Sequence, residues 1–384
     1  MQTEVLNRLR ECMAAQLSWL ISCQIVRPGT DADGAIALRP GSGRVNPYFA
    51  NFAALALLED PLGFPAVERY LEWYRRHLRK DGTIPDYHYQ PDRPPRPSAP
   101  DSEDAYAGTY LSLVARYHRR TGRTDWLRAH LPEVKRVAGV IVRLMDRDGL
   151  TFARADHPVK FLMDNCEVYR GLADLAQTQE LLGDAEAGRF WSLARQVAAG
   201  VEKTLWDRRR GCYCPAVAAG FAARANWRRF YPDAACQLFP ALYDLIPADS
   251  RRAARLYARF NRYHPGWVGL KPPDYPWMLL AYCAGLHGDS GRALEKLWQA
   301  WEAYVVPGSE SWHCAEAAFF VRTATYLLLQ YHHHHPAAPE QSFRRPDYAR
   351  PGAPGAGPGP NHPIRGAARR HPLPPGPALR NHGL

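Results

Sequence analysis

Residues 47–58 read Pro47-Tyr-Phe-Ala-Asn-Phe-Ala-Ala-Leu-Ala-Leu-Leu58, a run that would be apolar on nearly every side of a helix. A helix of this kind has to be buried all round. The next helical segment, Pro65–Leu78, is amphipathic and rich in Arg and Glu, so one of its faces has to meet water. The two segments together predict a buried helix followed by a helix that lies outside it.

The same alternation continues along the chain to about residue 330. Amphipathic segments that need one wet face are Thr3–Cys23, Pro65–Leu78, Asp125–Met145, Asp184–Leu205, Ser250–Phe260 and Ser290–Ala303. Between them lie more evenly apolar segments, with expected starts near Pro47, Asp104, Asn165, Tyr231, Tyr275 and Ser311. Six helices of each kind predict an all-α fold of two concentric layers, an (α/α)6 toroid of about six helical hairpins with few strands. An open solenoid of helix pairs is the alternative, but it would need a more regular repeat than these uneven spacings.

The composition changes abruptly after this helical region. Residues 332–384 hold 12 Pro and 7 Gly among 53 residues, with almost no apolar periodicity. Such a segment cannot bury enough apolar surface to offset the entropy of ordering. We therefore expect a toroid over residues 1–331 and a disordered Pro/Gly/Arg-rich tail over residues 332–384.

Charge and cysteine usage limit the classes of partner. The formal net charge is +11, of which the tail carries +5, and no recognisable nucleic-acid-binding motif accompanies it. We interpret the remaining positive charge as a solvated Arg-rich surface and expect no specific nucleic-acid partner. The eight cysteines lack the C-x-x-C spacing of a zinc site, and no apolar run reaches the length of a membrane span. These features predict a cytoplasmic protein with reduced thiols, no metal site and no membrane contact; the oligomeric state stays open.

The candidate catalytic and binding residues lie at the starts of the buried helices. Inner helices of such a ring run roughly parallel, so their N-termini gather on one face. Acidic and aromatic residues recur together at these entrances and in one preceding loop, at Tyr48, Asp86, Tyr87, Asp101, Asp104, Tyr106, Asp164, Tyr169, Asp233, Tyr275, Trp277, Glu310, Trp312 and His313. Aromatic faces and carboxylates together suit a sugar, and acid-catalysed cleavage of a glycosidic bond needs two carboxyl groups.

Helix capping is the competing interpretation of each acid taken alone. Asp101-x-x-Asp104 and Asp164-x-x-Glu167 both have the spacing of a capping box. Capping does not explain why a Tyr or Trp stands beside the acid at nearly every entrance. The joint pattern therefore favours a pocket.

Three stretches resemble the six-hairpin glycosidase superfamily: Asp101-Ser-Glu-Asp-Ala-Tyr-Ala-Gly-Thr-Tyr-Leu111, Asp148-Gly-Leu-Thr-Phe152 with the later Phe161–Leu172, and Tyr231-Pro-Asp-Ala234. The resemblance covers residues 1 to about 330 and assigns no single family. It implies a toroid with its active site at the N-terminal mouth of the inner helices, hydrolysis of a carbohydrate substrate without a cofactor, and a general acid with a general base. Matching positions suggest Asp104, Asp164 and Glu310 as the catalytic residues.

The remaining acids and aromatics at the entrances are then expected to bind substrate: Tyr48, Asp86, Tyr87, Asp101, Tyr106, Tyr169, Asp233, Tyr275, Trp277, Trp312 and His313. We expect Glu310 to be the acid, because the adjacent Trp312 would desolvate its carboxyl and raise its pKa. Asp104 and Asp164 stand near helix N-termini, where the dipole favours a carboxylate.

Two other functions stay open at this stage. A sugar isomerase or epimerase works by proton transfer, for which His is the usual carrier at neutral pH. His313 and His88 would be its candidates. A non-catalytic toroid that binds a glycan or another partner is the second alternative. The sequence does not give the sugar or the linkage.

Overall fold

The computed structural model describes residues 2–90 and 93–334. The chain divides into two units, residues 1–327 and 328–384, and the boundary lies within the last helix. The tail expected to be disordered lies outside the described residues, apart from its first three positions. No helix in the described part of the chain has both the length and the apolar composition that a membrane span requires.

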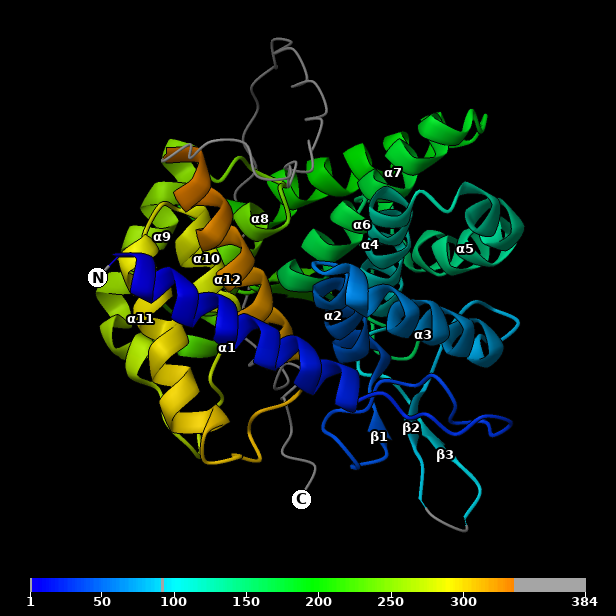
Figure 1. The fold of residues 1–384 in the computed structure, drawn as a ribbon. Coiled ribbons are helices and arrows are strands. Elements are labelled where there is room, and N and C mark those ends of the chain that lie inside the picture. The colour runs from blue at the N-terminus through cyan, green and yellow to red at the C-terminus, as the bar shows by residue number, and fades with distance from the viewer. Residues whose placement is uncertain (1, 91–92, 335–384) are drawn as a thin grey trace, which may run out of the picture. The chain divides into compact units, whose positions relative to one another are not determined.

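Six helical segments form the inner layer of the first unit (Figure 1). Neighbours pack in chain order, and aromatic rings close the circle: Phe319 of α12 lies 5.2 Å from Phe52 of α2 and 6.3 Å from Tyr282 of α10. The fold is therefore the expected (α/α)6 toroid. The inner helices are α2 (Pro47–Leu57), α4 (Glu103–Thr121), α6 (Leu162–Leu182), α8 (Phe239–Leu242, after two helical turns, Phe230–Ala234 and Ala235–Leu238), α10 (Met278–Leu286) and α12 (Cys314–His334).

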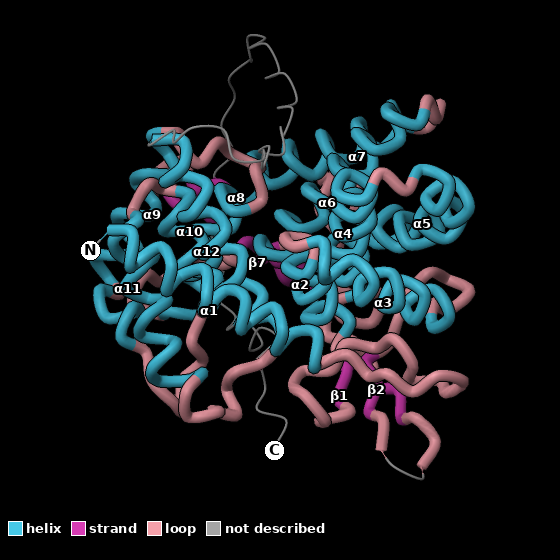
Figure 2. The backbone as a smooth tube through the Cα atoms, in the orientation of Figure 1, coloured by secondary structure: helices cyan, strands magenta, loops and turns pink. Residues whose placement is uncertain are grey.

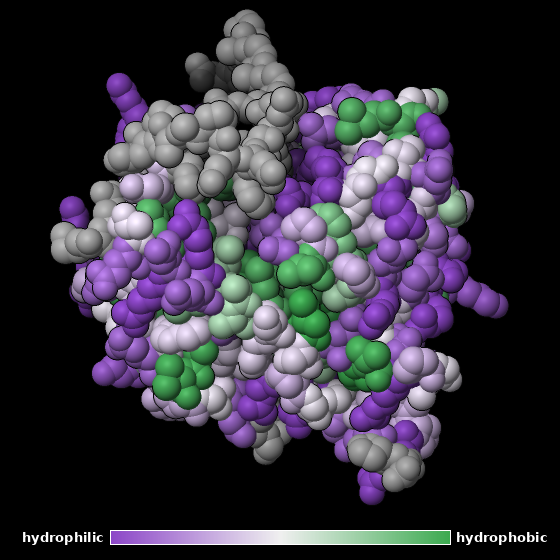
Figure 3. All heavy atoms as spheres, viewed as in Figure 1, coloured by the Kyte–Doolittle hydropathy of each residue, from purple (hydrophilic) through white to green (hydrophobic). Residues whose placement is uncertain are grey.

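Six amphipathic helices form the outer layer, each packed on an inner neighbour. In α9 only one stripe, including Ala253, Leu256 and Phe260, is buried, and Arg residues cover its wet face. Figure 3 shows hydrophilic side chains over the outer helices α3 and α5 and apolar ones over α2. The outer helices are α1 (Gln2–Ser22), α3 (Phe64–His77), α5 (Thr124–Leu144), α7 (Ala187–Gly200), α9 (Arg251–Tyr263) and α11 (Ser290–Ala300).

The described residues hold more strand than the sequence indicated, although every strand is short (Figure 2). The strands lie in loops that lead into or out of inner helices, where two or three residues pair with no apolar periodicity to announce them. They form three antiparallel sheets: β1 (Arg44–Val45), β2 (Asp86–His88) and β3 (Arg96–Ser98); β4 (Val159–Phe161), β7 (Ala216–Ala218) and β8 (Phe221–Ala222); and β5 (Trp206–Asp207) with β6 (Cys212–Tyr213).

Two glycines set how closely α4 and α6 approach. A Cβ atom on Gly171 of α6 would lie 2.3 Å from the carbonyl oxygen of Gly108 of α4, and one on Gly108 would lie 2.8 Å from the carbonyl oxygen of Glu167. Neither position has room for a side chain, so the two backbones touch at this point. Gly108 follows Asp104 by about one turn, and Gly171 follows Glu167 by about one turn. The close approach therefore brings the entrances of α4 and α6 together.

Candidate functional site

Two aspartates from different inner helices meet through one serine at these entrances. The Ser102 Oγ atom lies 2.7 Å from Oδ1 of Asp104 and 2.6 Å from Oδ2 of Asp164. Asp104 is fully buried, whereas the Asp164 residue keeps 8% of its surface exposed. Burial, followed by the neighbouring Asp104 carboxylate, raises the pKa of Asp164 well above its ordinary value. Asp164 is therefore the acid of this pair whose protonated form is favoured by its surroundings.

Asp104 has more hydrogen-bond donors than Asp164. The Thr151 hydroxyl donates to its Oδ2 at 2.6 Å, and the backbone N–H of Ala105 donates to its Oδ1 at 2.8 Å. Burial raises the pKa of Asp104 to about 6, while the hydrogen bonds from Thr151 and Ser102 lower it. Asp104 is thus mostly ionised at neutral pH, and with no exposed surface it lies beneath the entrance.

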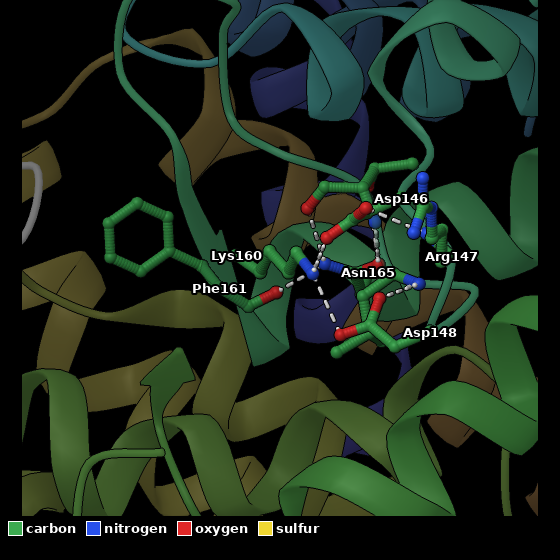
Figure 4. A network of polar contacts seen from close by, with 8 residues as sticks. Asp146, Arg147, Asp148, Lys160, Phe161 and Asn165 are labelled. Atoms are coloured by element: carbon green, nitrogen blue, oxygen red, sulfur yellow. Dashed lines mark hydrogen bonds and ion pairs between the residues drawn. The ribbon is translucent and has the colours of Figure 1, made fainter. Parts of the chain in front are cut away.

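The loop that carries Thr151 is fixed by the buried Lys160 ammonium, which forms ion pairs with two partly exposed aspartates (Figure 4). The Lys160 ammonium lies 2.6 Å from Oδ2 of Asp146 and 2.7 Å from Oδ2 of Asp148. Asn165, in the first turn of α6, accepts a hydrogen bond from the backbone N–H of Thr151 at 2.8 Å. These contacts hold the Thr151 hydroxyl against Asp104.

Glu167 lies one helical turn after Asp164 and is held by two tyrosines. The hydroxyls of Tyr48 and Tyr243 donate to its Oε1 atom at 2.6 and 2.9 Å. Burial raises the pKa of Glu167 to about 8. In the sequence, Glu167 stood out only as part of a capping pattern, but the structure places it with Asp164 and Tyr48.

A second pair of acids stands around the hydroxyl of Tyr106. This hydroxyl donates to Oδ1 of Asp86 at 2.9 Å, and Asn46 donates to Oδ2 of the same carboxyl at 3.1 Å. Burial raises the pKa of Asp86 to about 7. Asp101 is exposed, yet the surrounding protein removes enough solvent to raise its pKa, as happens for a side chain in a concave surface. Its charge acts on both Asp86 and Asp164, so Asp101 lies near both of them.

The entrance of α12 is arranged differently. The Glu310 side chain is 64% exposed and lies 3.9 Å from Arg39. The Trp312 indole is buried and donates to Oε1 of Gln16 at 3.0 Å, toward α1. The expected desolvation of Glu310 by Trp312 is therefore wrong, because the two side chains point to different neighbours. Trp312 instead lines a cleft of about 400 Å³ with Trp19 and Arg39, among others.

His313 lies inside the ring rather than on this rim. Its ring stacks on Phe49 with centroids 4.7 Å apart and meets the edge of Tyr275 at 5.7 Å. Burial lowers the pKa of His313 to about 4, so it is neutral at pH 7. Glu316, in the first turn of α12, lies 3.9 Å from it, and burial raises the pKa of Glu316 to about 7.

The other expected substrate residues are held by partners other than the acids described above. Tyr87 packs against Trp73, His77 and Tyr89, because it alternates with Asp86 along β2. Buried Asp233 accepts from the backbone N–H of Asn226 at 2.7 Å, which is a loop-fixing contact. Trp277 packs on Phe230 and Tyr231, and Tyr169 is buried in α6.

We name as the carboxyl cluster the five acids that do meet: Asp86, Asp101, Asp104, Asp164 and Glu167. Tyr48 and Tyr106 contact it, stacked on each other with centroids 5.8 Å apart. Sequence reasoning missed Ser102, Thr151, Asn46 and Tyr243, although Ser102 stands inside the quoted stretch that begins at Asp101. Within the described residues, no three His, Cys, Asp or Glu side chains are placed to hold a metal ion.

Comparison with known proteins identifies the architecture. No model of a known protein family matches the sequence, and no curated protein matches it. Among solved structures, the chain is similar to a variant glycosidase in complex with glucose, with a TM-score of 0.60 at 15% identity over 86% of this chain and 98% of that one. It is also similar to a GH63 mannosylglycerate hydrolase from Thermus thermophilus (TM-score 0.53, 13% identity, 84% and 100%). A rhamnosidase from Klebsiella oxytoca gives a TM-score of 0.56 at 13% identity, over 82% and 64%.

These likenesses confirm the resemblance to six-hairpin glycosidases at the level of the fold.

Proposed function

We propose that the protein is a glycoside hydrolase that cleaves an O-glycosidic bond at the carboxyl cluster. The observation that carries the proposal is a buried carboxyl with a raised pKa, Asp164, near an exposed carboxyl, Asp101, at the mouth of an (α/α)6 toroid. Hydrolysis of a glycoside needs this combination of one carboxyl that gives a proton and another that activates water. The glycosidase fold of the neighbours supports the choice of chemistry.

The roles follow from burial and protonation. Asp164 gives its proton to the leaving oxygen as the bond between that oxygen and the anomeric carbon breaks. Asp101 takes a proton from the water whose oxygen forms the new bond to that carbon. Asp101 suits the base because it is exposed to water, and Asp164 suits the acid because its pKa is raised. Asp104, fully buried, acts as a positioning residue.

Two aromatic rings of the same entrances are proposed to receive the sugar. Tyr48 and Tyr106 have their hydroxyls committed to Glu167 and Asp86, which fixes their orientation. A fixed aromatic wall among carboxyls offers both an apolar face and hydrogen-bond acceptors to a sugar ring. The titratable groups that contact these two tyrosine hydroxyls are carboxyls rather than histidines, which favours hydrolysis over isomerisation.

A panel of oligosaccharides and aryl glycosides, assayed for release of reducing sugar, tests the proposal. We expect turnover of at least one member, and the activity should follow the protein through size exclusion and disappear at its melting temperature. Binding of a glycan without turnover on any member would contradict hydrolysis and identify a binding toroid.

A further inference from the structure

The contacts of the Ser102 hydroxyl indicate how many protons it and its two carboxyl neighbours hold. A hydroxyl has one proton to donate, and its oxygen can accept. Ser102 Oγ nevertheless lies within 2.7 Å of two carboxyl oxygens, one on Asp104 and one on Asp164. It can donate to only one of them. The other contact brings two oxygens together, and it is attractive only if that carboxyl carries a proton and donates it.

The direction of the chain of hydrogen bonds follows from the other partners. Asp104 already accepts from Thr151 and from the backbone N–H of Ala105, so it is the carboxylate to which Ser102 donates. Asp164 then donates to Ser102. We infer that Asp164, Ser102 and Asp104 share one proton in the order Asp164–O–H to Ser102–O–H to the Asp104 carboxylate, and that Ser102 is a positioning residue that keeps Asp164 in its acid form.

This arrangement penalises the loss of the shared proton. When both carboxyls are ionised, Ser102 can satisfy one of them only, and the second oxygen–oxygen contact becomes repulsive. The singly protonated pair has one more hydrogen bond than the doubly ionised pair. As the acceptor of the Asp164 proton, Ser102 therefore raises the pKa of Asp164, whereas a Ser102 that donated to Asp164 would lower it. The same hydroxyl lowers the pKa of Asp104 by donating to it.

The surroundings of Asp164 act in the same direction. The charged groups that act on it are Asp104, Asp101 and Glu167, all carboxyls, and each raises its pKa. The nearest ammonium of the network in Figure 4, that of Lys160, is already paired with Asp146 and Asp148. The proton on Asp164 thus depends on hydrogen bonding and on neighbouring acids.

As the acid of hydrolysis, Asp164 would pass this proton to the leaving oxygen and regain one from solvent after the products leave. This use of the proton rests on the proposed function, but its location does not. The proton can therefore be tested without turnover, by following the ¹³C NMR shift of the Asp164 carboxyl, in protein labelled at the aspartate carboxyl carbons, against pH. Asp164→Asn assigns the signal.

Three variants distinguish a shared proton from a simple loss of a hydrogen-bond donor. Ser102→Ala should lower the titration midpoint of Asp164 by about one pH unit, the equivalent of one hydrogen bond. Thr151→Val removes the other hydroxyl from Asp104, which is a carboxylate both before and after Asp164 loses its proton, so it should leave that midpoint nearly unchanged. Ser102→Thr keeps the hydroxyl and should restore the original value.

An upward shift in Ser102→Ala, or no shift, would overturn the inference, because a hydroxyl that donated to Asp164 would lower its pKa and its removal would raise the midpoint. A midpoint below pH 6 in the unmutated protein would overturn it as well. If the titrations follow the prediction while the glycoside panel gives no turnover, the shared proton stands and the proposed hydrolysis fails.

Discussion

The entrances of α4 and α6 and the entrance of α12 are built from similar residues with opposite results. Each has an acid near an aromatic side chain, at the start of an inner helix. At α4 and α6 the acids turn inward and converge through Ser102, Tyr48 and Tyr106. At α12, Glu310 turns to solvent and Trp312 turns to α1. The difference teaches that convergence depends on how closely the helices approach, and not on residue type alone.

The backbone contact between Gly108 and Gly171 brings the entrances of α4 and α6 together. Gly171→Ala should destabilise the protein by about 4 kcal/mol or more, since a methyl group 2.3 Å from a backbone oxygen forces two helices apart and exceeds ordinary overpacking. Urea unfolding measures the loss. Gly188→Ala in α7 is the matched control, because a Cβ atom there has no neighbour within 4 Å, and it should be neutral or slightly stabilising. Equal stabilities for the two variants would show that the close contact is unimportant.

Glu167 provides the next largest effect, through pH. Its pKa is about 8 in the folded state against an ordinary 4.5, so the folded state holds a proton that the unfolded chain has already released. Stability contributed by this proton is present at pH 5 and is lost as the pH rises to 8, by about 3 kcal/mol. Glu167→Gln keeps an oxygen for Tyr48 and Tyr243 and cannot ionise, so its unfolding free energy should fall less over this range. Identical pH slopes for variant and parent would contradict a protonated Glu167.

Glu310 should show the smallest effect. An exposed ion pair contributes little, because solvent screens it and two side chains lose freedom. Glu310→Gln should therefore change the unfolding free energy by less than about 0.5 kcal/mol and turnover by less than about twofold, judged by urea unfolding and by the most active glycoside. A large loss of turnover would show that Glu310 takes part in the reaction and would contradict the contrast between the two regions.

Sequence patterning was sufficient for the layers and for the end of the inner helices at which the carboxyl cluster lies. The apolar run from Pro47 predicted α2, and in the structure the Asn46 side chain caps it by accepting from the N–H of Phe49 at 2.9 Å. Asp104, Asp164, Asp101 and Asp86 were all expected at the mouth, and all four belong to the carboxyl cluster.

The direction in which each side chain points at the mouth of the ring could not be predicted in the same way. Successive residues of a helix point about 100° apart, so a shift of one or two residues in the start of a helix turns a side chain from the ring to its rim. Glu310 stands in the loop before α12, where no periodicity constrains it, and Glu167 was hidden by its fit to a capping box. Ser102 gave no signal of its own, since its role depends on Asp164, which lies 62 residues along the chain.

The central claim, that Asp164 is the proton donor at the converging entrances, is tested most directly with two substrates that differ only in leaving group. An alkoxide leaving group needs a proton, whereas a dinitrophenolate leaves without one. Asp164→Asn should lower turnover of the alkyl glycoside by on the order of 10³-fold and that of the dinitrophenyl glycoside by less than about tenfold, given the usual contribution of general acid catalysis. Equal losses on the two substrates, or no loss on either, would contradict the claim.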